Sequence, residues 1–179
     1  MIILIVAAAL LVVIGGYFIA TQRNLVALDE RVKNSLSQIG VQLKTRWDAI
    51  TLLAKMVEKY SKHEHDTLMD AIAARRSPIK TAGDAQTQQN ACDQMLARIN
   101  AVAEQYPQLR ASELYTNTMN QINEYENNVR MSRQIYNDTA TRLNSAVRQW
   151  PTSIVAGMLD FKQCEYLHVE NDKTDIPTI

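Results

Sequence analysis

The densest group of titratable side chains lies in the run Lys62-His63-Glu64-His65-Asp66. Imidazole and carboxylate groups in such a cluster are ligands for zinc, and they act as acids or bases in hydrolysis. On a helix, however, positions two apart point ~200° from each other, so His63 and His65 cannot easily share one ion. The spacing also differs from the His-Glu-x-x-His pattern of metalloproteases. We therefore expect a solvated helix face, with a metal-dependent hydrolase that uses His63 and Glu64 as the weaker alternative.

A second polar group lies between Arg133 and Asp138, in a long stretch without Gly or Pro. Arg133 and Asn137 are spaced i and i+4, so they share one face of a helix, and Tyr136 lies beside the same seam. Polar groups inside a helical bundle need partners, and a Glu from another helix would suit Arg133. We expect Arg133, Tyr136, Asn137 and Asp138 to form a network that fixes helix register, with a binding patch for another protein as the alternative.

The remaining candidates for chemistry are Cys92 and Cys164, which form no Cys-x-x-Cys motif and have no adjacent His. A catalytic thiol needs a basic group nearby, and only Lys162 lies close to Cys164 in the sequence. Lys plus Arg and Asp plus Glu number 19 each, which argues against a dedicated nucleic-acid-binding protein. We therefore predict no catalytic residue, no cofactor-binding residue, no metal ligand and a chain that is not an enzyme.

The chain begins with an uncharged run from Ile2 to Ala20. As a helix this run is ~28 Å long, close to the ~30 Å hydrocarbon core of a bilayer. Only Met1 stands before it, and Thr21-Gln22-Arg23-Asn24 after it is not an Ala-x-Ala-like cleavage site. We expect residues 1–21 to form a retained transmembrane helix, with residues 2–20 in the membrane, rather than a cleaved signal peptide.

The basic residues nearest this run lie on its C-terminal side, at Arg23, Arg31 and Lys33. Because basic residues are retained on the cytoplasmic side of a membrane, we expect the N-terminus outside and the polar domain in the cytoplasm. Two cysteines far apart in the sequence also fit a reducing compartment better than a disulfide framework. The sequence thus predicts a single-pass protein with a cytoplasmic domain.

The polar part of the chain is rich in helix-forming residues, and its apolar side chains recur at three- and four-residue spacing. This pattern predicts an all-α fold, an elongated antiparallel helical bundle over 22–168 with a disordered tail over 169–179. The spacing leaves open whether the transmembrane helix continues into the bundle. The expected helices cover about 22–76, 84–106 and 112–149 and a short piece after 153, with Asp84, Ser112 and Ser153 as N-terminal caps.

The short C-terminal piece is amphipathic, with apolar residues at Ile154, Val155, Met158, Leu159 and Phe161. Such a helix either lies on a membrane surface or closes the end of the bundle through its apolar face. We favour the second role, in which the piece closes the end of the bundle through the corner at Trp150.

Five groups of residues follow one another along the chain. They are Arg31-Val32-Lys33-Asn34 with Ser37 to Lys44 and Arg46; Val57, Tyr60 and Lys62-His63-Glu64; Ala103 to Pro107; Glu124 to Asn128 with Arg133 to Asp138; and Pro151, Ile154 and Ala156-Gly157 with Phe161-Lys162 and Glu165-Tyr166. In this order, behind an N-terminal apolar run, they resemble the LemA family of bacterial membrane proteins. Thr51 and Leu52 stand where the family usually has Pro and Asn, which predicts a straighter first helix here.

The resemblance implies a single N-terminal span in the bacterial inner membrane, with the N-terminus outside and a helical bundle in the cytoplasm. It also implies a family whose biochemical activity is poorly defined. We therefore expect a non-enzymatic scaffold or protein-interaction module. Its partners are the membrane and unidentified proteins or copies of itself, and not nucleic acid. A membrane-shaping or lipid-binding oligomer is the alternative.

Overall fold

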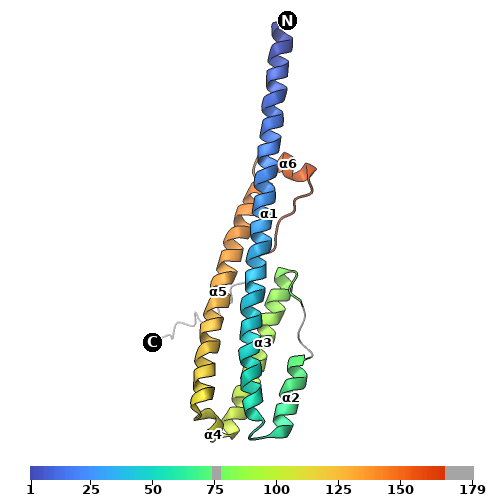
Figure 1. Ribbon diagram of the computed structural model, residues 1–179. Helices are drawn as coiled ribbons and strands as arrows, with labels where there is room; N and C mark the ends of the chain where they lie inside the picture. The colour runs from blue at the N-terminus through green and yellow to red at the C-terminus, as the bar shows by residue number, and fades with distance from the viewer. Residues whose placement is uncertain (74–77, 168–179) are drawn as a thin grey trace, which may run out of the picture. The chain divides into compact units, whose positions relative to one another are not determined.

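The computed structural model describes residues 1–73 and 78–167, and every regular element in these ranges is an α-helix (Figure 1). This confirms the predicted all-α fold, in which a long apolar helix is followed by a helical bundle. The expected disordered tail, residues 169–179, lies outside the described residues. The helices are α1 (Ile2–Val57), α2 (Lys62–Ala73), α3 (Ala82–Gln105), α4 (Pro107–Arg110), α5 (Glu113–Arg148) and α6 (Thr152–Met158).

Helix α1 runs without a break from Ile2 to Val57, so the apolar run and the first bundle helix are one element. Side chains 1–17 are all exposed, which leaves a bare apolar surface on this part of the helix. Farther along α1 one side is buried at three- and four-residue spacing, as predicted. The residues of this stripe are Leu25, Val32, Ile39, Leu43, Trp47, Ile50, Ala54 and Val57. The helix also passes through Thr51, whose hydroxyl donates to the Trp47 carbonyl at 2.7 Å.

The prediction of one helix over about 22–76 is wrong, because α1 ends at Val57 and a turn precedes α2. No Gly or Pro marks this break. The backbone N–H groups of Tyr60 and Ser61 both donate to the Val57 carbonyl at 2.9 Å, which closes the first helix. The Ser61 hydroxyl then accepts from the Glu64 N–H at 3.3 Å, as an N-terminal cap does. The turn at Tyr60 and Ser61 therefore ends α1, and the serine cap begins α2. Both lie within a helical pattern that is continuous in the sequence.

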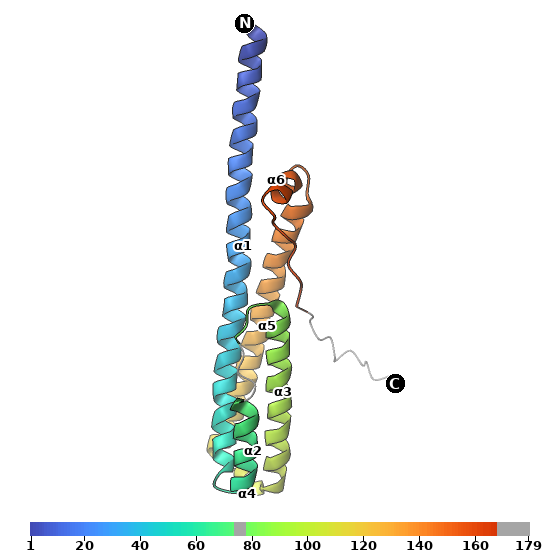
Figure 2. The same cartoon turned by 90° about the vertical axis from the view of Figure 1, so that its right-hand side faces the viewer.

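The chain forms two compact units, and the first contains residues 1–35 and 135–166. In this unit the last part of α5 and all of α6 lie beside α1 (Figures 1 and 2). The expected cap of α6 at Ser153 is wrong, since α6 begins at Thr152 and Pro151 precedes it without a side-chain hydrogen bond. Val155 and Ala156 of α6 are buried, so one face of this short helix packs inside the unit, but Trp150 is exposed and the expected closure through it is not seen.

Helix α6 ends in a tight hydrogen-bonded turn that reverses the chain. The N–H of Phe161 donates to the Ala156 carbonyl at 3.0 Å, and the N–H of Asp160 donates to the Gly157 carbonyl at 3.4 Å. Asp160 has a φ of 54°, the left-handed conformation that this helix ending requires. The following residues therefore run back along α5 instead of extending the helix.

The second unit contains residues 36–134 together with Leu167. In it the part of α1 from Leu36, then α2, α3 and the first part of α5 lie side by side and alternate in direction (Figure 1). The four segments thus make an antiparallel bundle, with α4 in the connection between α3 and α5. Its core includes Leu53, Met95, Ile99, Ile122 and Val129.

The starts of α3 and α5 are set by hydroxyl caps. Before α3, the Thr81 hydroxyl accepts from the Asp84 N–H at 3.1 Å, and the Asp84 carboxylate accepts from the Thr81 N–H at 2.9 Å. This capping box corrects our expectation, because Asp84 is the third helical residue and Thr81 is the cap. Before α5, the Ser112 hydroxyl accepts from the Tyr115 N–H at 3.3 Å, which confirms the predicted cap.

Candidate functional site

The four residues of the expected register network fall in both units, with Arg133 in the second and the other three in the first. Arg133 is 6% exposed, and its guanidinium donates to the amide oxygen of Gln86 at 2.6 Å and to that of Gln89. We expected a Glu here, and both of these acceptors are glutamine amides on α3. The contact joins α5 to α3, which supports a role in helix register.

Tyr136 is buried in the first unit, and its hydroxyl donates to the Glu165 carbonyl at 3.0 Å. Burial, followed by the nearby Cys164 and Glu165, raises the pKa of the Tyr136 phenol, so this hydroxyl stays a donor. Asn137 is half-buried, and Asp138 is exposed. The four residues of the expected network therefore have unequal surroundings, because Arg133 and Tyr136 are buried while Asn137 and Asp138 are not.

Asn144 holds the returning C-terminal segment, a role that the sequence analysis missed. It is 3% exposed, its Oδ1 accepts from the Cys164 N–H at 2.7 Å, and its Nδ2 donates to the Cys164 carbonyl at 2.9 Å. One side-chain amide thus pairs with both backbone groups of Cys164, as a neighbouring strand would do. Asn144 and Tyr136 lie eight residues apart on α5, which places both on one face toward residues 164 and 165.

The histidine cluster lies at the start of α2 in the second unit. His63 is exposed, and His65 Nδ1 lies 3.1 Å from a carboxylate oxygen of its neighbour Asp66, which is itself exposed. Within residues 1–73 and 78–167, no three His, Cys, Asp or Glu side chains are placed to hold a metal ion together. Within the cluster Lys62, His63 and Asp66 are exposed, whereas Glu64 and His65 are half-buried.

A buried charge that the sequence analysis did not single out lies on α1 at Arg46. Its side chain is 1% exposed, and Nη2 contacts Asp93 of α3 at 2.8 Å and Glu126 of α5 at 3.3 Å. Both carboxylates are partly exposed, at 45% and 41%. Arg46 therefore joins three helices of the second unit. Its position inside the apolar stripe, between Leu43 and Trp47, was the available signal.

The guanidinium of Arg46 is not fully satisfied. Its Nε and Nη1 are buried, and neither has a hydrogen-bond partner among the described residues. A buried donor without a partner costs ~1–3 kcal/mol, so the ion pair is held at an energetic cost. The cation also lies near Cys92, where burial raises the thiol pKa to about 12 despite the opposing effect of Arg46. That thiol is therefore un-ionised near neutral pH, which argues against a nucleophilic role.

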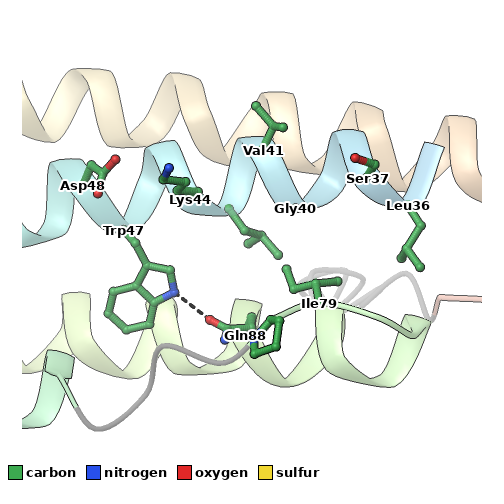
Figure 3. Close-up of a pocket in the computed structure, with 11 residues that line it drawn as sticks. Leu36, Ser37, Gly40, Val41, Lys44, Trp47, Asp48, Ile79 and Gln88 are labelled. Carbon is green, nitrogen blue, oxygen red and sulfur yellow. Dashed lines mark hydrogen bonds between the residues drawn. The ribbon is translucent and has the colours of Figure 1, made fainter. Parts of the chain in front are cut away.

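A cavity of about 510 Å³ opens in the second unit between α1, the segment Pro78-Ile79 and α3 (Figure 3). Trp47 forms part of its wall, with its indole N–H donating to the Gln88 amide oxygen at 2.9 Å. Ile79 lies opposite Gly40, where a Cβ would be 3.9 Å from Ile79 Cδ1, an ordinary van der Waals distance. The other lining residues are Leu36, Ser37, Val41, Leu43, Lys44 and Asp48.

The cavity has an apolar wall and a polar edge, so it suits an apolar side chain of a ligand. Its wall combines an indole with aliphatic side chains, and Val41 beside it is 60% exposed. Lys44 and Asp48 are exposed residues at its edge, so opposite charges flank the apolar wall. Grooves of this kind hold the apolar face of a partner helix or peptide.

The fold and these contacts define a class, an all-α bundle that carries a long bare apolar helix at its N-terminus. Helix α1 has the length and composition to cross a membrane, and none of its most apolar 18-residue window is buried. The profile of the LemA family matches residues 35–179, which is most of the chain. The chain therefore belongs to the LemA family.

Individual relatives agree with this assignment. Protein LemA of Metamycoplasma hominis is 25% identical over 166 residues, covering 90% of this chain and 75% of that protein. Magnetosome protein MamQ of Magnetospirillum gryphiswaldense is 32% identical over 84 residues, and MamQ 2 of Paramagnetospirillum magneticum is 33% identical over 84 residues. These matches cover 47% of this chain but only 30% of each MamQ protein. The chain thus spans about a third of the MamQ length.

Proposed function

We propose that this protein is a single-pass membrane protein whose helical bundle binds other proteins without catalysing a reaction. The observation that carries the proposal is the continuity of α1, whose bare apolar start passes without a break into a helix that packs in the bundle. A helix that is apolar on all sides for ~28 Å is stable only where water is absent, as inside a bilayer.

Charge supports a cytoplasmic bundle at the bacterial inner membrane. Arg23 and Arg31 are exposed on α1 after the apolar run, and Lys33 pairs with Asp29 at 2.8 Å. Acidic partners contribute little to topology, so the count of basic residues still favours the cytoplasm for this side. The N-terminus then lies outside the membrane.

The contacts of the two buried arginines support a structural rather than a catalytic role for these residues. Arg46 contacts carboxylates of two other helices, and Arg133 is held by two amides, so both cations serve contacts between helices. The cavity beside Trp47 remains as a concave apolar surface with charged residues at its edge. We propose that an apolar segment of a partner protein docks there.

Fractionation of cells that express the full chain and a variant lacking residues 2–20 tests the anchor. We expect the full chain in the membrane fraction after carbonate extraction, and the shortened chain in the soluble fraction. Protease added to the outside of spheroplasts should leave the bundle intact. A mature protein that begins near residue 21 by mass spectrometry would contradict the proposal, because the apolar run would then be a cleaved signal.

A lipid-binding or membrane-shaping role is the second candidate, and one observation favours it. The outer side of α6 carries large exposed apolar side chains.

A further inference from the structure

The outer face of α6 and the turn before it expose three large apolar side chains within the first unit. Trp150, Ile154 and Met158 are 77%, 56% and 72% exposed. Ile154 and Met158 are four residues apart in α6, so they share one side of the helix, and Trp150 lies in the turn immediately before it. The opposite side carries Val155 and Ala156, which are buried. Packing inside the unit therefore accounts for only one of the two apolar faces of α6.

A direct contact fixes the level of α6 along α1. The hydroxyl oxygens of Tyr17 and Thr152 lie 3.4 Å apart, and either can donate the hydrogen bond. Tyr17 is close to the end of the apolar run Ile2–Ala20. Figures 1 and 2 both show α6 beside α1 at this level. The second apolar face of α6 therefore lies where the proposed span leaves the membrane.

From these observations we infer that α6 lies in the lipid interface, with Trp150, Ile154 and Met158 inserted at the boundary between headgroups and acyl chains. This inference rests on the proposed span. The occupant of the face is the bilayer that holds the span, because continuity with the apolar run brings lipid to this level.

The depth agrees with this placement. Tyr17 follows the middle of the run, residue 11, by six residues, or ~9 Å along a helix. The hydrocarbon core extends ~15 Å from its centre, so Tyr17 and Thr152 lie ~6 Å inside its edge. Interfacial amphipathic helices bury their apolar faces ~5–10 Å at this boundary. Tryptophan also prefers this zone, because its ring is apolar and its N–H needs a polar partner.

Charged residues next to α6 fit the headgroup side of the boundary. Arg148 is exposed at the end of α5, and Lys162 follows α6 in a 3.4 Å ion pair with the exposed Asp160. Arg23 is exposed on α1, six residues beyond Tyr17. Basic residues at this position are attracted to the anionic lipids of a cytoplasmic leaflet. The protein would then contact the membrane at two places, the span and α6.

Tryptophan fluorescence tests this inference on the full chain, because the only two tryptophans are Trp47 and Trp150. The Trp47→Phe variant is reconstituted into vesicles of phosphatidylcholine and phosphatidylglycerol in which the acyl chains are brominated near the headgroup. We expect the emission of Trp150 to fall by about twofold or more, as for an interfacial side chain. The matched Trp150→Phe variant keeps Trp47, which is 5% exposed in the second unit, and its emission should not change.

Two further measurements separate the possible failures. Flotation with the vesicles tests the span alone, so a chain that does not float contradicts the proposed function as well as this inference. A chain that floats while acrylamide in water, and not bromine, quenches Trp150 overturns the α6 inference only. Protection of Trp150 from both quenchers also overturns it, because a protein would then cover the face.

A substitution on the same face makes the test specific. Ile154→Asp changes an exposed side chain, so the fold should be kept, as judged by circular dichroism. A carboxylate at this depth opposes insertion, and we expect the bromine quenching of Trp150 to fall to near the level of the Trp150→Phe control. Unchanged quenching in the Ile154→Asp variant would show that this face does not enter the lipid.

Discussion

The buried Arg46 offers the sharpest test of how the second unit is held together. Replacing it with methionine removes the contacts with Asp93 and Glu126 and keeps most of the volume of the side chain. It also removes Nε and Nη1, the two buried donors without a partner among the described residues. The variant therefore compares a charged contact with an apolar one at a single site.

The expected magnitude follows from these contacts. Each hydrogen bond from a charged donor contributes ~1.5–3 kcal/mol, and the two carboxylates can return to water because they are 45% and 41% exposed. Against this, each unpartnered buried donor costs ~1–3 kcal/mol. We expect Arg46→Met to leave the free energy of unfolding unchanged or to raise it by up to ~2 kcal/mol. Arg46→Ala should be at least ~2 kcal/mol less stable than Arg46→Met, because it leaves a cavity.

Urea unfolding of the full chain in detergent measures both variants, followed by the fluorescence of Trp47 in a Trp150→Phe background. Trp47 is buried next to Arg46 in the sequence and reports on the second unit. A loss of more than ~2 kcal/mol in Arg46→Met would refute the reasoning, since it would show that the buried ion pair stabilises the bundle on balance.

Three other predictions follow from single contacts. Gly40→Ala should raise stability by ~0.5–1 kcal/mol in urea unfolding, because Gly is a poor helix former and a methyl group makes only an ordinary contact with Ile79; a loss would contradict this. Burial raises the pKa of the Cys92 thiol to about 12, from a value near 9 in the unfolded chain. Between pH 9 and 12 only the unfolded chain loses this proton, so the free energy of unfolding should fall as the pH rises. That slope should flatten in Cys92→Ala, and an unchanged slope would count against a buried thiol. Tyr136→Ala should cost ~3–5 kcal/mol and His63→Ala less than ~0.5 kcal/mol in urea unfolding followed by circular dichroism, which reports on both units, and equal effects would defeat the register role of Tyr136.

Much of the fold was predictable because it follows from local patterns. The stripe on α1 from Leu25 to Val57 appears in the sequence as a simple spacing of apolar residues, and the structure buries it. The break after Val57 was missed because it is marked only by the Ser61 cap. A serine is a weaker signal for the end of a helix than a Gly or a Pro. Asp84 was expected to be the N-cap of the next helix, but the cap is Thr81, three residues earlier, and Asp84 completes a capping box with it.

The site was less predictable because its contacts join residues far apart in the sequence. Arg46 and Glu126 are separated by 80 positions, and no local pattern links them. An arginine inside an apolar stripe shows that a partner must exist, but not which carboxylate supplies it. The cavity likewise needs Trp47, Ile79 and Gln88 from three separate segments. By contrast, the exposure of His63 was anticipated, because two-residue spacing on a helix disfavours a shared ion with His65 and so favours a solvated position.

Photo-crosslinking in intact cells tests most directly whether another protein docks in the cavity beside Trp47. A photoreactive amino acid takes the place of Lys44 or Lys55. Both lysines are exposed on α1, and only Lys44 lines the cavity, so Lys55 is a matched control. We predict a discrete adduct with another protein from position 44 that is absent from position 55 and weakened by Gly40→Leu, which narrows the cavity. The same adducts from both positions, or adducts only with lipid or with a second copy of the chain, would contradict the account.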